Sequence, residues 1–491
     1  MTPQEYVFKT EPFQHQRDVF EESADKEYWA YFLEPGLGKS KLLIDNIAYL
    51  YMKGEIEGAV VSTVKAMTPT FSLVEFPTHT PDDVNYLSFR YDAAKVNLKS
   101  FKTEWVEFLK FKGLKVFIIN TEGAMSPNLT RMMREFYAVV GNRYLMGIDE
   151  SSQIKTHTAK RSKAIVKFSR AAKYRRIMTG TPVTNGPLEI FGQAMALGPT
   201  LELLGHKSFY SFRGYFADME KKTFGNRSFN VVTGYKNTKE LTDTMGSWSS
   251  IIRKEDALDL PDKIYSKVVV EMTKKQKAMY EKLRQEAIIE LESIGDEIEV
   301  TNILTMVVKL HQIVCGQLKY QDDFGAEKYE TIENNRIQTL MDLLELEEGN
   351  VIIWAHFRQS LYDIIHAVQE KYGVESVIPY YGSVSQKSRE EAVSRFQDQN
   401  DPARFFIGNP QSAGMGLTLT AADLAIYYSN SYSLEQRIQS EDRHHRIGQT
   451  RVARYIDLVT PDTIDEKVLS ALRSKKSLAD RIVVSNWRNI L

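Results

Sequence analysis

Ten short apolar runs, in two sets of five, constrain the fold of this chain more than any other feature. Each run is apolar nearly throughout, which is typical of strands buried on both faces of a parallel sheet. Longer amphipathic stretches separate the runs. We therefore expect an α/β fold that binds its ligands at the carboxyl ends of the strands. The first set is Trp29–Leu33, Ala59–Thr63, Lys115–Asn120, Tyr144–Asp149 and Arg176–Thr179, and the second is Val351–Phe357, Ser376–Tyr381, Arg404–Asn409, Leu424–Ser429 and Tyr455–Thr460.

The composition of the 491-residue chain excludes several classes of protein. Its 63 Lys and Arg residues against 64 Asp and Glu residues give a net charge of −1, which excludes a globally basic nucleic-acid coat but leaves a local basic surface open. The single cysteine, Cys315, excludes an internal disulfide and a CxxC zinc module. No apolar run approaches ~18 residues, and the first residues lack the apolar core of a signal peptide. We therefore expect no membrane span and a cytoplasmic location.

The sequence between the two sets of runs differs from both of them in composition and periodicity. Residues Leu201–Ser250 are aromatic and punctuated by glycine. Residues Met272–Leu318 have helical periodicity, with a capping box at Thr273 and Gln276, and we assign their apolar stripes to core packing. The intervening Arg253–Asp262 is a predicted hinge.

The segment EPGLGKS (Glu34–Ser40) follows a predicted strand and opens a predicted helix. Its glycines, Gly36 and Gly38, let the backbone approach phosphates, and the helix N-terminus attracts anions. In such a loop Lys39 reaches the β- and γ-phosphates of ATP, and Ser40 binds Mg²⁺. The first glycine of the strict GxxxxGK[ST] pattern is a leucine here, and the alternative is an ordinary glycine turn.

Polar residues also end two other runs. Asp149 suits a Mg²⁺ ion held through water, and Glu150 suits the orientation and deprotonation of an attacking water. The alternative is a solvated acidic pair at the start of a loop. The hydroxyls of Thr179 and Thr181 suit coupling of the hydrolysis site to another part of the molecule. For these two residues alone, a plain turn is the favoured interpretation.

Two arginines near the end of the second set, Arg443 and Arg446, are three residues apart and predicted to share one face of a helix. Arginine suits a γ-phosphate because its guanidinium is planar, always charged and bidentate. The alternative is a charged, solvated helix. We reject a metal site at the adjacent His444 and His445, because neighbouring side chains face apart on a helix.

The ordered set of motifs resembles the superfamily-two helicase-like ATPases, and among them the Swi/Snf-type branch. The glycine–glutamine ending of the last motif is specific to that branch. The matches keep the family order over most of the chain. The matching segments are QHQ (14–16), EPGLGKS (34–40), DESS (149–152), TGTPVTN (179–185), VIIWAHF (351–357), YYGSVSQKSREEAVSRF (380–396), SAGMGLTLTAAD (412–423) and QSEDRHHRIGQTR (439–451).

The resemblance implies two RecA-like parallel-sheet lobes with helical insertions, which bind ATP between them and close alternately along duplex DNA. A chain this compact resembles bacterial or bacteriophage members of the branch, in keeping with a location in the bacterial cell or the phage-infected host. The implied domains are lobe 1 over 1–200, an insertion and hinge over 201–262, a helical protrusion over 263–335, lobe 2 over 336–460 and a C-terminal brace helix over 461–491.

The resemblance also implies roles for single residues. The sequence departs from the family at Ser152, which replaces the usual histidine of the second motif. Coupling of the second motif to the third through that histidine is therefore in doubt. Thr418 replaces a common asparagine, and 431–433 replace a common Trp-Asn-Pro. The implied catalytic residues are Lys39, Glu150, Arg443 and Arg446, the Mg²⁺ ligands are Ser40 and Asp149, and the other nucleotide contacts are Gln16, Gly36, Gly38, Gly416 and Gln439.

Two sets of residues are candidates for nucleic-acid contact. Residues 151–180 hold nine Lys or Arg residues and no acid, so either part of this run meets DNA or it forms a solvated helix face. Small neutral donors at strand ends contact backbone phosphates without reading sequence. The basic residues are Lys155, Lys160, Arg161, Lys163, Lys167, Arg170, Lys173, Arg175 and Arg176, and the strand-end donors are Ser62, Thr63, Asn120, Thr121, Asn409, Gln411 and Ser412.

The leading hypothesis is a DNA-stimulated ATPase that translocates on double-stranded DNA, with ATP and Mg²⁺ as its nucleotide and metal. Its substrate would include forks that it remodels or anneals, or proteins that it displaces. One alternative is a conventional helicase that separates strands. The alternative from another class is a nucleotide-gated DNA-binding scaffold without turnover. The presence of Glu150 together with Arg443 and Arg446 argues against it, because a scaffold has no need to activate water.

Overall fold

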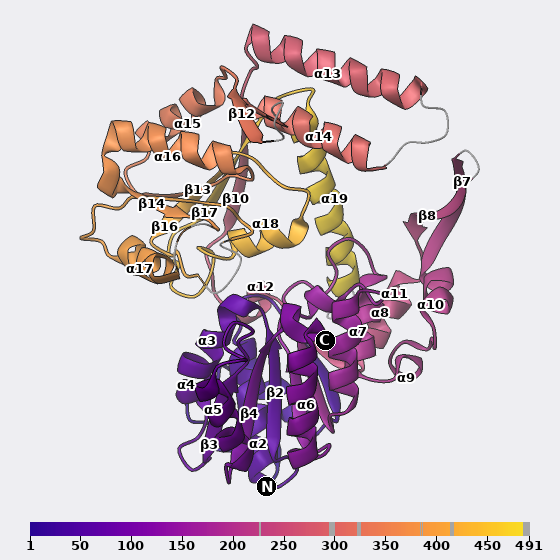
Figure 1. Cartoon of the computed structure of the whole chain (residues 1–491). Coiled ribbons are helices and arrows are strands. Elements are labelled where there is room, and N and C mark those ends of the chain that lie inside the picture. Colours follow the sequence, from indigo (N-terminus) through magenta and orange to yellow (C-terminus); the bar gives the residue numbers. More distant parts are fainter. Residues whose placement is uncertain are drawn as a thin grey trace. The chain divides into compact units, whose positions relative to one another are not determined.

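The computed structural model describes the chain except for residues 225–226, 294–299, 322–325, 383, 385, 413–416 and 485–491. The chain divides into two compact units, one built mainly from Met1–Met219 and Val232–Leu258 and the other mainly from Asp259–Ser477. Each unit has a central sheet with helices on both faces (Figure 1). No helix in the described part of the chain is long and apolar enough to cross a membrane.

The first unit is organised around a seven-stranded, all-parallel sheet with the order β3-β4-β2-β5-β6-β1-β9. Alternate residues of β1 enter two separate cores: Ala30 and Phe32 pack on one face, whereas Tyr31 and Leu33 pack on the other. The apolar runs of the sequence are therefore buried on both faces, as expected. The strands are β1 (Tyr28–Leu33), β2 (Gly58–Thr63), β3 (Tyr86–Arg90), β4 (Leu114–Asn120), β5 (Tyr144–Ile148), β6 (Tyr174–Met178) and β9 (Ser249–Ile252).

Helices connect these strands, as parallel pairing requires. A further pair of strands, β7 (Ala217–Phe224) and β8 (Arg227–Tyr235), forms a separate two-stranded sheet. The helices are α1 (Gln14–Ser23), α2 (Lys39–Met52), α3 (Thr68–Thr70), α4 (Phe76–His79), α5 (Lys99–Lys110), α6 (Pro127–Val140), α7 (Lys160–Arg170), α8 (Glu189–Leu197), α9 (Thr200–Leu204), α10 (Phe209–Phe216), α11 (Thr238–Gly246) and α12 (Lys254–Ala257).

The second unit has a six-stranded, all-parallel sheet with the order β10-β17-β16-β13-β15-β14. Its core is again double, because Val351 and Ile353 of β13 pack on one face and Ile352 and Trp354 on the other. The strands are β10 (Lys263–Val269), β13 (Asn350–Trp354), β14 (Val377–Tyr380), β15 (Phe405–Gly408), β16 (Ala422–Tyr427) and β17 (Ala453–Val459).

The predicted helical stretch of this unit forms α13 and α14. The capping box is present: the Thr273 amide donates to Gln276 Oε1 at 3.1 Å, and the Gln276 amide donates to Thr273 Oγ1 at 3.2 Å. The elements outside the sheet are α13 (Lys274–Ser293), α14 (Val300–Val314), the hairpin β11 (Gln317–Gln321) and β12 (Glu327–Thr331), α15 (Arg336–Glu345), α16 (Arg358–Tyr372), α17 (Gln386–Gln397), α18 (Leu434–Glu441) and α19 (Ile464–Val484).

All ten predicted strands are present, but three strands of the two parallel sheets were not predicted. These are β3 and β9, the two edges of the first sheet, and β10, an edge of the second. An edge strand is covered on fewer sides, and β10 has mostly exposed residues, so its sequence lacks a continuous apolar run. Strand β9 lies inside the expected insertion and hinge (201–262), which therefore contributes to the first sheet.

Candidate functional site

The predicted phosphate loop connects β1 to α2 in the first unit. Gly36 and Gly38 have φ values of 91° and 78°, in the left-handed region that favours glycine. Lys39 Nζ donates to the carbonyls of Leu33 at 2.7 Å and Glu34 at 3.3 Å, so its ammonium group lies across the loop. Ser40 follows in the first turn of α2. The strand–loop–helix context that a phosphate loop requires is therefore present.

Gln16 supports this loop directly. Its Oε1 accepts from the Phe13 amide at 3.0 Å, and its Nε2 donates to the Leu37 carbonyl at 3.1 Å. A Cβ atom at Gly38 would lie 2.0 Å from Gln16 Nε2 at a φ of 78°, so a side chain there would be strained and would displace the Gln16 amide. A cavity of 790 Å³ opens beside α1, and its lining includes Phe13, His15 and Ile252 together with the acidic Asp18 and Glu22. The volume and these ring and alkyl side chains suit a flat heterocycle.

The acidic pair follows β5, and its two members have different surroundings. Asp149 Oδ2 accepts from Thr63 Oγ1 at 2.7 Å. Burial raises the pKa of Asp149, while the hydrogen bond from Thr63 and the charge of Lys39 act in the opposite direction. Strands β5, β6 and β1 are adjacent and parallel, so the acidic pair and the phosphate loop leave the same edge of the sheet. Between them, a Cβ atom at Gly180 would lie 2.6 Å from Cδ of Pro35 in the loop.

Glu150 has a φ of 50°, an uncommon value for a residue with a side chain, and such values concentrate at functional sites. Its Oε2 accepts from Thr179 Oγ1 at 3.3 Å, and the Thr179 hydroxyl also accepts from the Thr181 amide at 3.2 Å. Thr179 is fully buried. The structure thus joins the predicted water-activating residue to the segment Thr179–Pro182. The four residues of that segment alone did not indicate this connection.

Three of the predicted nucleic-acid contacts have internal roles. The side chains of Ser62, Thr63 and Thr121 are fully buried. Thr121 Oγ1 lies 3.0 Å from Ser62 Oγ and donates to the Thr63 carbonyl at 3.1 Å, while Thr63 binds Asp149. Their hydroxyls are therefore not available to phosphates in this structure, because neighbouring strand ends use them. The prediction is corrected for these three side chains.

The other strand-end donors are more accessible. Asn120 and Asn409 are half-buried, as is Ser412, and Gln411 is exposed. Asn409 organises its own turn, because its Nδ2 donates to the His356 carbonyl at 2.7 Å and its Oδ1 accepts from the Gln411 amide at 2.9 Å. Contact between these residues and nucleic acid remains a prediction.

In the second unit the two arginines do not share a helix face, contrary to expectation. Helix α18 ends at Glu441, and Arg443 and Arg446 lie in the turn that follows. Arg443 Nε donates to the Gln439 carbonyl at 2.9 Å, and Arg446 Nη1 donates to the Leu417 carbonyl at 3.0 Å. Among the described residues, no carboxylate lies within ion-pair distance of Arg446. Gly416 is outside the described residues.

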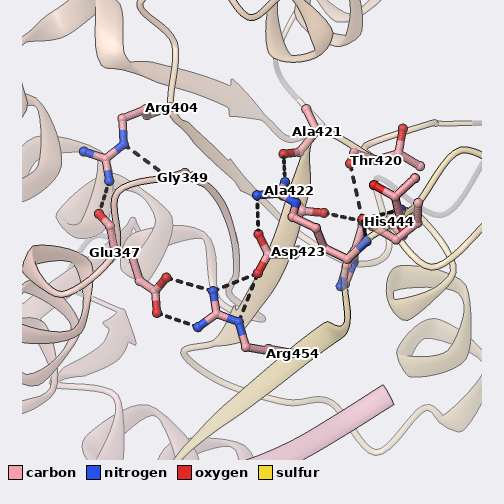
Figure 2. A network of polar contacts seen from close by, with 12 residues as sticks. Glu347, Gly349, Arg404, Thr420, Ala421, Ala422, Asp423, His444 and Arg454 are labelled. Carbon is pink, nitrogen blue, oxygen red and sulfur yellow. Dashed lines mark hydrogen bonds and ion pairs between the residues drawn. The ribbon is translucent and has the colours of Figure 1, made fainter. Parts of the chain in front are cut away.

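Gln449 closes this turn, a role that the sequence did not reveal. Its Nε2 donates to the carbonyls of Ala422 at 2.7 Å, His444 at 3.2 Å and Thr420 at 3.3 Å, and its Oε1 accepts from the amides of Thr450 at 3.1 Å and Arg451 at 3.0 Å. Figure 2 shows the carbonyl groups of this network. The glycine–glutamine ending of the last motif marked Gln449 in the sequence, but it did not indicate these hydrogen bonds.

Ion pairs extend the same network at its solvent side (Figure 2). Arg454 makes two 2.8 Å contacts with the carboxylate of Glu347 and also binds Asp423 Oδ2 at 2.8 Å. Arg451 pairs with the other oxygen of Asp423 at 2.8 Å. The start of β16 is thereby joined to β17 and to the residues just before it, and β17 is joined to the residues that follow α15.

The basic run 151–180 divides into structural and exposed residues. Lys155 pairs with Glu189 at 3.1 Å, Lys173 pairs with Glu55, and the fully buried Arg176 donates to carbonyls at the end of α1. Arg175 binds backbone carbonyls, and Arg161 is half-buried. The exposed residues recur at three- and four-residue spacing on one face of α7, and they are Lys160, Lys163, Lys167 and Arg170.

Two family models match this chain. One, described as an SNF2-related domain, matches residues 32–318, which is more than half of the chain. The other, described as a helicase conserved C-terminal domain, matches residues 335–448. The matches include the phosphate loop, the acidic pair, Thr179–Pro182 and both arginines.

Curated relatives are similar over most of this chain. The putative ATP-dependent helicase/translocase YwqA of Bacillus subtilis is 26% identical over 69% of this chain and 36% of its own length. A human SWI/SNF-related, matrix-associated, actin-dependent regulator of chromatin (subfamily A member 1) is 27% identical over 71% of this chain and 32% of its own length. The chain thus spans about a third of the length of these relatives.

A solved structure, the Sulfolobus solfataricus SWI2/SNF2 ATPase core in complex with dsDNA, is 22% identical with a TM-score of 0.42, covering 99% of this chain and 95% of that chain. The family match rests on the first domain, whose matched range covers more than half of the chain. The two parallel sheets and the ordered motifs agree with that match. The chain therefore belongs to the SNF2-related family, within the Swi/Snf-type branch of the superfamily-two helicase-like ATPases.

Proposed function

We propose that this chain is a DNA-stimulated ATPase that translocates on duplex DNA. The observation that carries the proposal is that the Gly36–Ser40 loop and the acidic pair follow β1 and β5 at the same edge of one parallel sheet, with only β6 between them. The loop supplies backbone amides, a helix N-terminus and the Lys39 ammonium for the phosphates of ATP. Glu150, held by Thr179, then orients and deprotonates the attacking water.

The donor set at this site fits Mg²⁺. The ion prefers oxygen ligands and is usually held by one or two carboxylates together with substrate phosphates. Asp149 offers a buried carboxylate oriented by Thr63, and Ser40 offers a hydroxyl in the first turn of α2. Bound Mg²⁺ would neutralise charge that develops on the phosphates.

The turn 442–449 of the second unit supports hydrolysis rather than binding alone. Arg446 is half-buried, and burial lowers the pKa of its guanidinium. A desolvated cation that binds a carbonyl group gains more from a phosphate than a fully solvated one does. We propose that Arg443 and Arg446 contact the triphosphate held by the first unit, and that Gln439 and Gly416 assist them. ATP then favours a closed arrangement of the two units, and product release reverses it.

Duplex DNA is the proposed polymer because the chain belongs to the Swi/Snf-type branch and two of its relatives are named as a helicase/translocase and a regulator of chromatin. The exposed cations of α7 and the polar groups at Asn120, Gln411 and Ser412 suit backbone phosphates, which are bound without regard to base sequence. Forks, annealing intermediates and DNA-bound proteins are the proposed substrates. A location in the bacterial cytoplasm or the phage-infected host accompanies this proposal.

The decisive test is ATP turnover with and without linear duplex DNA, for the wild type and Glu150→Gln. We expect stimulation by duplex in the wild type and loss of turnover in the variant, with ATP binding retained. Absence of hydrolysis under both conditions would remove the enzyme proposal and leave the nucleotide-gated scaffold.

Translocation and strand separation are distinguished on one preparation of the protein. A translocase displaces a third strand from a triplex without unwinding the underlying duplex, whereas a conventional helicase releases a labelled strand from a tailed duplex. We expect triplex displacement alone. Release of the duplex strand at a similar rate would favour the strand-separating alternative.

A further inference from the structure

A buried chain of hydrogen bonds connects the acidic pair to the segment Thr179–Pro182 through helix α8. Ser151, which follows Glu150, donates its Oγ hydrogen to Gln193 Oε1 at 2.7 Å. Gln193 Nε2 in turn donates to the Pro182 carbonyl at 2.7 Å. The side chains of Ser151 and Gln193 are both fully buried. We propose that Gln193 is a positioning residue that couples the state of Glu150 to Thr179–Pro182, an inference that rests on the proposed ATPase function.

The amide of Gln193 fits this position in one orientation only. Its oxygen faces a hydroxyl donor, and its nitrogen faces the Pro182 carbonyl and, more weakly, the Glu189 carbonyl at 3.4 Å. A reversed amide would place an oxygen against two carbonyl oxygens, which repel it. The side chain is therefore fixed at both ends, and a displacement of Ser151 is transmitted to Pro182 rather than absorbed by rotation.

The rest of α8 explains why this polar chain is unusual. Its other buried side chains are apolar and include Ile190, Phe191 and Leu197. A glutamine among such residues costs folding free energy unless both ends of its amide are hydrogen-bonded. An apolar residue would fill the same space without that requirement, so the geometry points to a role for the amide beyond filling volume.

Close packing keeps α8 against the residues that follow the acidic pair. A Cβ atom at Gly192 would lie 2.4 Å from the Lys155 carbonyl oxygen and 2.7 Å from that of Ile154. At the start of the helix, Lys155 Nζ donates to Thr184 Oγ1 at 2.6 Å and pairs with Glu189 at 3.1 Å. Glycine thus permits the approach, and an ion pair fixes the helix at its N-terminal end.

Two parallel connections therefore join the acidic pair to Thr179–Pro182. One is the direct bond from Thr179 to Glu150, and the other runs from Ser151 through Gln193 to Pro182. A change in the position of Glu150 after hydrolysis acts on both ends of the segment, so it moves as one piece. Loss of the Gln193 connection leaves Pro182 free of that constraint while the nucleotide contacts remain.

The test compares Gln193→Met, Ser151→Ala and the double variant in the full chain, with Ser169→Ala as the matched control. Ser169 is another fully buried serine, and its Oγ donates to the carbonyl of Ala196, three residues after Gln193 in α8, at 2.6 Å. ATP turnover is measured against ATP concentration, with and without linear duplex DNA. Thermal midpoints report any loss of stability.

We expect each of the first two variants to lower the duplex-stimulated kcat on the order of tenfold, with the KM for ATP unchanged. The double variant should be no worse than either single variant, because both belong to one chain. Ser169→Ala should retain wild-type stimulation with a comparable loss of thermal stability. If Gln193→Met fails to fold, Ser151→Ala, which deletes a single hydroxyl, decides the question.

Wild-type stimulation in Ser151→Ala and Gln193→Met would overturn the inference and leave the proposed function intact. Equal losses in Ser169→Ala would also overturn it, because they would reflect stability alone. A wild-type chain without ATP turnover under either condition would refute the proposed function itself, and this inference with it.

Discussion

Replacing Gln449 with methionine removes one buried amide while keeping the length of the side chain. The amide makes five hydrogen bonds to the backbone, of which the bond to the Ala422 carbonyl at 2.7 Å is the shortest. Gln449 is 5% exposed, so the carbonyl groups it leaves have little access to water. The perturbation therefore tests whether the turn 442–449, which carries Arg443 and Arg446, depends on this amide.

The magnitude follows from the partners of the amide. Thr450 and Arg451 are exposed, so their amides can bind water instead. The carbonyls of Ala422, His444 and Thr420 share two amide hydrogens, and a buried group left without its partner costs ~1–3 kcal/mol. We expect a loss of about 3 kcal/mol in the local stability of the turn. Turnover should then fall tenfold or more, up to the ~10³-fold cost of losing an arginine outright.

Hydrogen–deuterium exchange over peptides that cover 443–451, together with ATP turnover, measures both effects in the full chain. Gln397→Met is the matched control: Gln397 donates to Thr420 Oγ1 at 3.0 Å and accepts from the Ala421 amide at 2.8 Å, but does not contact the turn. We expect faster exchange and lower turnover in Gln449→Met alone. Unchanged exchange and turnover in that variant would show that the turn 442–449 does not depend on the Gln449 amide.

Three other changes test separate parts of the structure. Arg446→Ala should lower kcat on the order of 10³-fold without unfolding the chain, and full activity would refute the proposed arginine contact. Gly38→Ala should weaken ATP binding, measured by titration with a fluorescent analogue, because a Cβ would lie 2.0 Å from Gln16 Nε2 at a φ of 78°. Burial lowers the pKa of His444 to about 3. Between that value and about pH 6.5 this histidine is protonated in the unfolded state but not in the folded state, so the free energy of unfolding falls by ~1.4 kcal/mol for each pH unit that the pH drops. The thermal midpoints measured at pH 7 and at pH 5 should therefore lie closer together in His444→Phe than in the wild type.

The interior strands of both sheets were predictable, whereas three of the four edge strands were not, β14 being the exception. A strand between two neighbours, under helices on both faces, has to be apolar nearly throughout, and β1 and β13 follow this rule. An edge strand such as β10 pairs through its backbone on one side only and tolerates exposed polar side chains. Local sequence therefore carries little signal for it, and only the register against β17 identifies it.

The site shows the same division between local and distant information. The phosphate loop was predictable because its function depends on consecutive residues between one strand and one helix. Thr63 was assigned to nucleic acid because the sequence shows only that it ends a strand. Its partner Asp149 lies 86 residues further along the chain and reaches it through the adjacent pairing of β2 with β5. Gln193 escaped prediction for the same reason, since both of its partners come from other elements.

The basic run 151–180 shows why charge counted along the sequence is not charge on a surface. Its nine cations have no acid among them in sequence, yet Glu189 and Glu55 come from elsewhere to neutralise Lys155 and Lys173. What remains is the exposed face of α7. We therefore expect the slope of log affinity against log salt for duplex DNA to decrease when Lys163 is replaced by glutamine, by ~0.9 for each phosphate that is no longer neutralised, and to stay constant for Lys173→Gln. An equal decrease in both variants would mean that the ion pair to Glu55 does not withdraw Lys173 from the DNA-binding surface.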